Sequence, residues 1–213
     1  MKALYVFLAW MLTIPFSVFA QEEKVSMLVI TGGHDFDRTA FFNMLNSFEG
    51  IRYQEKTHPT ANAIFETEIS ENYDVILFYD SWQEIDEQHK KGFEELIRKG
   101  CGLVFLHHSL VNYQAWDFYK DVMGGSYILA SDDKSRLSNY KHDVSFDAVI
   151  VEKDHPITKG ISDFSIFDEI YGNVWVSTKV QSLVETSHTA SMNPIVWCKE
   201  IKPGTRTVYV QPG

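Results

Sequence analysis

Residues 73–107 read YDVILFYDSWQEIDEQHKKGFEELIRKGCGLVFLH, and this stretch decides the fold. Two apolar runs, Tyr73–Tyr79 and Gly102–His107, enclose the segment Asp86–Lys99, in which apolar residues recur at helical spacing. Gly100 follows that segment directly, in the position where glycine commonly ends a helix. The stretch therefore predicts a strand, a helix and a second strand.

Both predicted strands are apolar throughout rather than alternating. Strands of this kind are buried on both faces, and helices between them imply parallel crossovers. The apolar run Val25–Thr31 predicts an earlier strand, and a further helix is expected to begin at Asp37. One face of that helix carries Phe41, Met44, Leu45 and Phe48. The sequence thus predicts an α/β protein with a doubly wound, mostly parallel sheet.

The pattern changes in the second half of the chain. Gln114–Met123 predicts one more helix with an aromatic face, and Ala130–Lys141 is polar and loop-like. The strand candidates that follow come without long helices between them: Asp147–Val151, Gln181–Glu185, Pro194–Cys198 and Thr205–Gln211. We expect them to add antiparallel strands at one edge of the sheet, within a single domain.

Residues 1–20 have the three parts of a secretory signal peptide. Lys2 supplies the positive charge, residues 3–19 are mainly apolar, and the small Ala20 precedes a polar segment. We expect cleavage after Ala20, an exported domain of residues 21–213 in the periplasm or outside the cell, and no stable membrane span after cleavage. The alternative is an uncleaved anchor, although a span usually needs about 20 apolar residues.

The charge balance argues against nucleic acid as a partner. The chain has 19 basic and 29 acidic residues. Loss of Lys2 with the signal peptide leaves a net charge of 18 − 29 = −11. An acidic surface repels phosphate backbones.

Two cysteines, Cys101 and Cys198, lie beside or within apolar strands. They could pair in an oxidising compartment, but two cysteines do not form a disulfide framework. We favour the interpretation that both are unpaired residues of the core.

Polar side chains gather where three predicted strands end. The strand ends read Thr31–Phe36 (TGGHDF), Tyr79–Trp82 (YDSW) and His107–Ser109 (HHS). Ligands of open parallel sheets bind at the carboxyl ends of the strands, so we expect a site at this edge.

Histidines dominate these strand ends. His107 and His108 are adjacent and would point to opposite faces of a strand, unless the strand ends there. Neutral imidazole binds divalent metals and transfers protons near neutral pH. One hypothesis is a divalent metal held by His34, His108 and His142; the other is an acid/base cluster without a metal.

Acidic and aromatic residues complete the candidate site. Glu169 lies among apolar residues, where a carboxylate could act as a general base or orient a sugar hydroxyl. A solvated turn or an acid at a helix N-terminus explains it equally well. Aromatic faces suit sugar rings, whereas Trp116 is more simply a core residue. The catalytic candidates are His34, His107, His108 and Glu169, and the substrate-binding candidates are Asp35, Trp82, His142 and Tyr171.

Five motifs in this order resemble the ThuA-like family, which is named for trehalose utilisation. They are Gly33–Phe36 (GHDF), Gly102–Ser109 (GLVFLHHS), Met123–Gly125 (MGG), Asp154–Gly160 (DHPITKG) and Phe167–Tyr171 (FDEIY). The resemblance implies a flavodoxin-like, class I glutamine amidotransferase-like fold. It also implies a small carbohydrate substrate, such as a trehalose-type disaccharide or its 3-keto derivative, and a role beside a sugar oxidoreductase.

The chain departs from true amidotransferases at the expected nucleophile. Those enzymes carry a cysteine on the turn after the third strand, but this turn contains His107, His108 and Ser109, and Cys101 lies at the opposite end of the strand. Ser109 lacks the Gly-x-Ser-x-Gly pattern of a serine nucleophile. The family typically ends with a strand followed by Gly-His-Asp or a similar motif, and this chain stops at Gly213, where that histidine would come, so we expect a truncated carboxyl end.

We therefore expect hydrolysis or isomerisation of a (3-keto-)disaccharide or glycoside, and no glutaminase activity. The alternative is a sugar-binding or interaction module that keeps the fold without chemistry.

Overall fold

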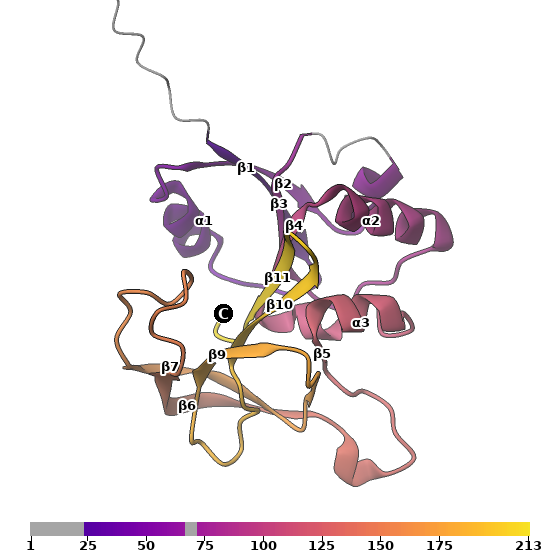
Figure 1. The fold of residues 1–213 in the computed structure, drawn as a ribbon. Helices are drawn as coiled ribbons and strands as arrows, with labels where there is room; N and C mark the ends of the chain where they lie inside the picture. Colours follow the sequence, from indigo (N-terminus) through magenta and orange to yellow (C-terminus); the bar gives the residue numbers. More distant parts are fainter. Residues whose placement is uncertain (1–23, 67–71) are drawn as a thin grey trace, which may run out of the picture.

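The fold is built on one nine-stranded sheet. The structure is a computed structural model that describes residues 24–66 and 72–213, so the predicted signal peptide lies outside the described residues. The strand order is β2-β1-β3-β4-β11-β10-β9-β6-β7. The first five of these strands are parallel, and β10, β9, β6 and β7 continue the sheet in antiparallel fashion. The predicted parallel sheet and its antiparallel extension are both present (Figure 1).

The parallel strands are β1 (Val25–Gly32), β2 (Ile51–Thr57), β3 (Val75–Asp80), β4 (Gly102–Leu106) and β11 (Thr205–Val210). The antiparallel strands are β6 (Asn139–Ile150), β7 (Phe164–Gly172), β9 (Gln181–Glu185) and β10 (Val196–Lys202). A separate two-stranded ladder joins β5 (Gly125–Ser126) to β8 (Trp175–Val176). The helices are α1 (Arg38–Asn46), α2 (Glu87–Lys99) and α3 (Asp117–Met123), with short 3₁₀ turns η1 (Ala61–Glu66), η3 (His107–Val111) and η4 (Lys134–Arg136).

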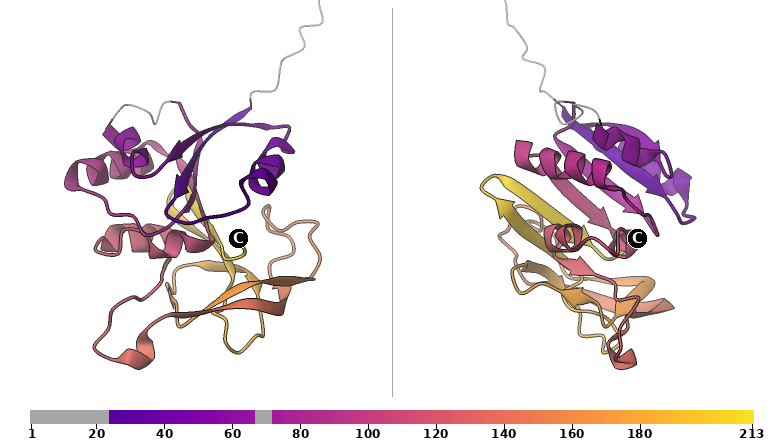
Figure 2. Two further views of the ribbon diagram at one scale, coloured as in Figure 1. Left: turned by 180° about the vertical axis from the view of Figure 1, so that it is seen from behind. Right: turned by 90° about the vertical axis from the view of Figure 1, so that its right-hand side faces the viewer.

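Helices cover both faces of the parallel part. Helix α1 lies on one side of the sheet, whereas α2 and α3 lie on the other (Figures 1 and 2). On the α1 side, Phe41 and Leu45 pack against β1 and β3. On the other side, Phe93 of α2 and Tyr119 of α3 join the larger core cluster. This arrangement is the predicted doubly wound fold.

Local signals explain where the helices begin and end. Asp37 accepts a hydrogen bond from the backbone of Ala40 at 2.9 Å and caps α1. Asp86 caps α2 in the same way, and Gly100 ends it with a left-handed φ of 103°. The predicted boundaries of α2 are confirmed.

Several details differ from the predictions. Met44 and Phe48 are each 44% exposed, so only half of the predicted apolar face of α1 is buried. Helix α3 begins at Asp117, three residues after the predicted Gln114. The long strand β6 starts at Asn139 and so takes up the end of the predicted loop.

Strand β11 also has a second role. It pairs antiparallel with β10, as expected for the added strands, and it pairs parallel with β4. It therefore brings the carboxyl-terminal residues to the middle of the sheet, beside the end of β4.

Both cysteines are buried and unpaired, in different core clusters. Over the described ranges, no helix combines the length and apolar character needed to cross a membrane.

Candidate active site

The site begins at the sharp turn after β4. His107 follows the strand with a φ of 46°, in the left-handed region that side-chain-bearing residues rarely adopt. The Tyr209 hydroxyl donates a hydrogen bond to the His107 carbonyl at 3.0 Å, and His107 Nδ1 lies 2.6 Å from the Gln211 carbonyl. Backbone strain that is held in place by neighbouring groups is common at functional sites.

The turn delivers two imidazoles to one carboxylate. Oε2 of Glu169, on β7, lies 3.1 Å from His107 Nε2 and 3.5 Å from His108 Nε2. The Tyr171 hydroxyl donates to the same oxygen at 3.0 Å and lies 2.9 Å from His107 Nε2. We refer to His107, His108, Glu169 and Tyr171 as the Glu169 cluster.

The hydrogen bonds constrain the protons of His107. Its Nδ1 faces the Gln211 carbonyl, which only accepts, so Nδ1 carries a hydrogen. In the neutral ring Nε2 then has a lone pair, which faces Oε2 of Glu169 at 3.1 Å. This contact is favourable only when a proton or a cation lies between the two atoms.

The charges of Glu169 and His108 are set by their surroundings. Burial raises the pKa of Glu169, but hydrogen bonds from His107, His108 and Tyr171 outweigh it and hold that pKa well below its usual value. Burial lowers the pKa of His108, and the Glu169 carboxylate opposes this effect only partly. Near neutral pH, an ionised carboxylate therefore lies beside a neutral imidazole.

A bulge in β6 adds His142 to the site. The pairing with β7 shifts between Lys141 and Val144, so that His142 and Asp143 face the single residue Glu169. His142 Nδ1 lies 3.6 Å from Glu169 Oε1, and its side chain is 66% exposed. His142 is therefore an exposed partner of Glu169 rather than part of the buried cluster.

His34 approaches from the end of β1. Its Nε2 lies 3.2 Å from the Tyr79 carbonyl, and its ring centroid lies 4.7 Å from that of His108. Among the described residues, the histidines within ion-pair distance of Glu169 are His107, His108 and His142, so His34 packs beside the cluster.

Two cavities meet at Glu169. The first, of about 450 Å³, is lined by Trp82, Tyr140 and Tyr171, and the second, of about 370 Å³, by His34, Asp35 and His107. His108, His142 and Glu169 line both. Every residue proposed from the sequence thus lies at this one edge, although its role there stays a prediction.

The structure points to a different metal-binding group from the one expected. Among the described residues, His107, His108 and Glu169 offer ligand atoms that all lie within 4.8 Å of one another. Only His108 belongs to the trio that we predicted. Two imidazole nitrogens and a carboxylate oxygen form a common ligand set for zinc and similar ions. The distance of 3.1 Å between His107 Nε2 and Glu169 Oε2, which needs a proton or a cation between the two atoms, supports this fit.

Two sequence interpretations can be settled from burial. Ser109 is fully buried, and its hydroxyl lies within hydrogen-bond distance of the carbonyls of Phe78 and Leu106, at 2.9 and 2.8 Å, so it has a structural role. Trp116 is 8% exposed and belongs to the core, as expected.

Sequence inspection missed Gln211. Its side-chain amide donates to the Glu169 carbonyl at 2.6 Å, while its own carbonyl faces His107. Its only sequence signal is its position as the last residue of the predicted strand Thr205–Gln211.

Comparisons with solved structures define the class of fold. A glutamine amidotransferase from Thermotoga maritima aligns with a TM-score of 0.50 and 10% identity, covering 90% of this chain and 76% of that one. A ThuA-like protein from Parabacteroides merdae has a TM-score of 0.71 and 15% identity, with 89% and 79% covered. One from Bacteroides uniformis has a TM-score of 0.68 and 19% identity, with 92% and 84% covered. The fold is therefore glutamine amidotransferase-like.

The family follows from the sequence itself. Residues 26–213 match the model of the ThuA family, described as trehalose utilisation. The chain belongs to the ThuA family, which links it to carbohydrate use. No curated protein matched the sequence.

Proposed function

We propose that this protein hydrolyses or isomerises a 3-keto-disaccharide or 3-keto-glycoside. The observation that carries the proposal is the convergence of His107, His108 and Tyr171 on the buried carboxylate of Glu169, between two cavities. Membership of a family described as trehalose utilisation supports a sugar as the substrate.

Keto sugars suit this set of groups. A ketone at C3 acidifies the hydrogen on C2, so a base can remove that proton. The electron pair then forms a C1=C2 double bond, the C1–O bond breaks, and the departing oxygen takes up a proton. Water adds to the resulting enone to give the free keto sugar. Isomerisation uses the same first step, after which the proton returns to a different atom of the sugar.

His108 is the group best suited to take the C2 proton. Burial keeps its imidazole neutral, and it lines both cavities. Once protonated, it would form an ion pair with Glu169, whose Oε2 lies 3.5 Å from His108 Nε2. His107 and Tyr171 are almost fully buried and hold Glu169 in position.

The same residues fit a divalent metal. His107, His108 and Glu169 would hold it. A bound metal polarises a carbonyl oxygen as a Lewis acid, which is the help that a keto sugar needs.

A sugar-binding module without chemistry is the second candidate. It is favoured by two strongly exposed aromatic rings in the lining of the first cavity, Trp82 at 63% and Tyr140 at 60% exposed. Such rings are suitable platforms for sugars whether or not a reaction follows.

The proposal also covers where the protein is located and which enzyme supplies its substrate. The composition of residues 1–20 supports export to the periplasm or beyond. A sugar oxidoreductase that forms the 3-keto group would supply the substrate.

The test is to incubate the purified protein with a 3-keto-disaccharide, such as 3-ketotrehalose, and to follow sugar release or rearrangement by chromatography. We expect His108→Ala and Glu169→Gln to reduce the rate by about 100-fold or more. His188→Ala is the matched control, because His188 lines neither cavity at Glu169. A wild-type protein that binds the sugar but leaves it unchanged, with or without divalent metals, would favour the binding module.

A further inference from the structure

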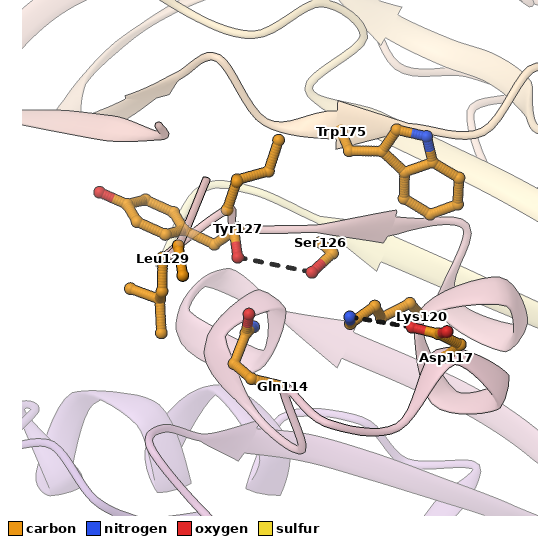
Figure 3. A pocket seen from close by; sticks show the side chains of 9 residues that line it. Gln114, Asp117, Lys120, Ser126, Tyr127, Leu129 and Trp175 are labelled. Carbon is orange, nitrogen blue, oxygen red and sulfur yellow. Dashed lines mark hydrogen bonds and ion pairs between the residues drawn. The ribbon is translucent and has the colours of Figure 1, made fainter. Parts of the chain in front are cut away.

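A third cavity, of about 540 Å³, lies beside the site but does not include the Glu169 cluster. Gln114, Lys120, Ser126 and Trp175 line it, and its wall also contains residues 127–129 (Figure 3). Tyr127, Ile128 and Leu129 line the 450 Å³ cavity at Glu169 as well. The two cavities therefore share a wall.

Tight packing fixes that wall. In the β5–β8 ladder, Ser126 pairs directly with Trp175. Gly125 packs so closely on the buried Trp197 that an added Cβ would lie 2.6 Å from its ring. The indole of Trp175 is thus presented by paired backbone rather than by a free loop.

The lining suits an uncharged ligand that has both an apolar face and hydroxyl groups. Trp175 is 42% exposed and offers an aromatic surface. The charges of Lys120 and Asp117 cancel in an ion pair of 3.1 Å. The Ser126 side chain is buried, and among the described residues its hydroxyl has only a long contact of 3.5 Å to the Tyr127 carbonyl, so it can bond to a ligand. A sugar ring has this combination of properties.

We propose that this cavity is a second sugar subsite, which binds a ring of the glycan other than the one at Glu169. The assignment of the reacting ring to the Glu169 cavity rests on the function proposed above, whereas binding at Trp175 does not. The shared wall at residues 127–129 lets one ligand reach both cavities, so this protein should prefer ligands with two or more sugar rings.

The test follows the indole N–H signals by NMR while unmodified sugars are added to the full protein. The panel comprises glucose, trehalose, maltose, cellobiose and maltotriose, and Trp175→Ala assigns the relevant signal. We expect at least one sugar of two or more rings to shift the Trp175 signal. Trp175→Ala should weaken its binding about tenfold and leave glucose binding unchanged.

Two further variants test whether the effect is specific to this cavity. Gln114→Ala removes an amide from the cavity without altering the β5–β8 pairing, and it should also weaken binding of the longer sugar. Phe48→Ala is the control, since Phe48 is as exposed as Trp175 but lies after α1. It should have no effect.

The outcomes separate the two proposals. Sugars that shift Trp82 but leave Trp175 unchanged, or a panel that never shifts Trp175, overturn the second subsite. A shift at Trp175 without any turnover of a 3-keto-disaccharide supports the subsite and counts against the proposed reaction.

Discussion

Glu169 and Tyr171 point to the same face of β7, and the Tyr171 hydroxyl donates a hydrogen bond to Glu169 Oε2 at 3.0 Å. Residues two apart on a strand share a face, so one strand supplies both the carboxylate and a neutral donor to it. Burial raises the pKa of Tyr171 most strongly, and the neighbouring Tyr209 and Glu169 side chains raise it further, which keeps the phenol protonated. The pair is thus a fixed donor and acceptor at all ordinary pH values.

Replacement of Tyr171 by Phe should destabilise the protein and slow turnover. The change removes a buried hydrogen bond to a charged group, which is worth about 2 kcal/mol. Urea unfolding measures the loss of stability. Tyr53→Phe is the control, because its hydroxyl binds Asn46 at the surface and should cost about 0.5 kcal/mol or less. Equal losses in the two variants would contradict a special role for Tyr171.

The stabilising effect of Glu169 should depend on pH. Its pKa is lower in the folded protein than in the unfolded chain, so its ionisation stabilises the fold above the unfolded pKa of about 4.3. This contribution is lost as the pH falls through the lowered pKa. Urea unfolding of the wild type and of Glu169→Gln, with a chelator present, measures this effect. The wild type should have the higher free energy of unfolding at pH 7, and the difference should shrink below about pH 4.3. A difference in the free energy of unfolding that grows on acidification would contradict the lowered pKa of Glu169.

The sequence predicted the parallel part of the fold because burial on both faces leaves a clear apolar signal. Strand β2, IRYQEKT, gave no such signal, since it lies at the sheet edge and alternates between half-buried and exposed residues. The residues of β7 are not among the predicted strands. Its carboxylate faces a polar site, which removes the apolar pattern that would reveal a strand.

The candidate site was predicted only in part. The rule that ligands bind at strand ends found His34, His107 and His108, because each lies at or just after the end of a predicted strand. The contact between His142 and Glu169 depends on a bulge in β6, and Gln211 depends on the parallel pairing of β11 with β4. Neither pairing register can be deduced from the residue types of one sequence.

Gly125→Ala should destabilise the core by about 1–3 kcal/mol, because the added methyl group would overlap Trp197. Trp197 is fully buried and donates a hydrogen bond to the Met123 carbonyl at 2.9 Å, so it has little room to move. Thermal or urea unfolding measures the effect. Gly50→Ala is the control, since nothing lies within 4 Å of its added Cβ. A variant at Gly125 as stable as that at Gly50 would contradict the tight packing behind Trp175.

Metal analysis should distinguish the ligand set of the structure from the one expected from sequence. If His107, His108 and Glu169 hold a divalent ion, protein dialysed against zinc or manganese should retain about one ion per chain. His108→Ala should lose it, because a ligand atom is removed. His34→Ala should retain it, because His34 Nε2 bonds to the Tyr79 carbonyl instead. Loss of the ion in both variants would restore the trio of His34, His108 and His142. Absence of a stoichiometric ion from the wild type would leave a proton between His107 and Glu169, and with it catalysis by proton transfer alone.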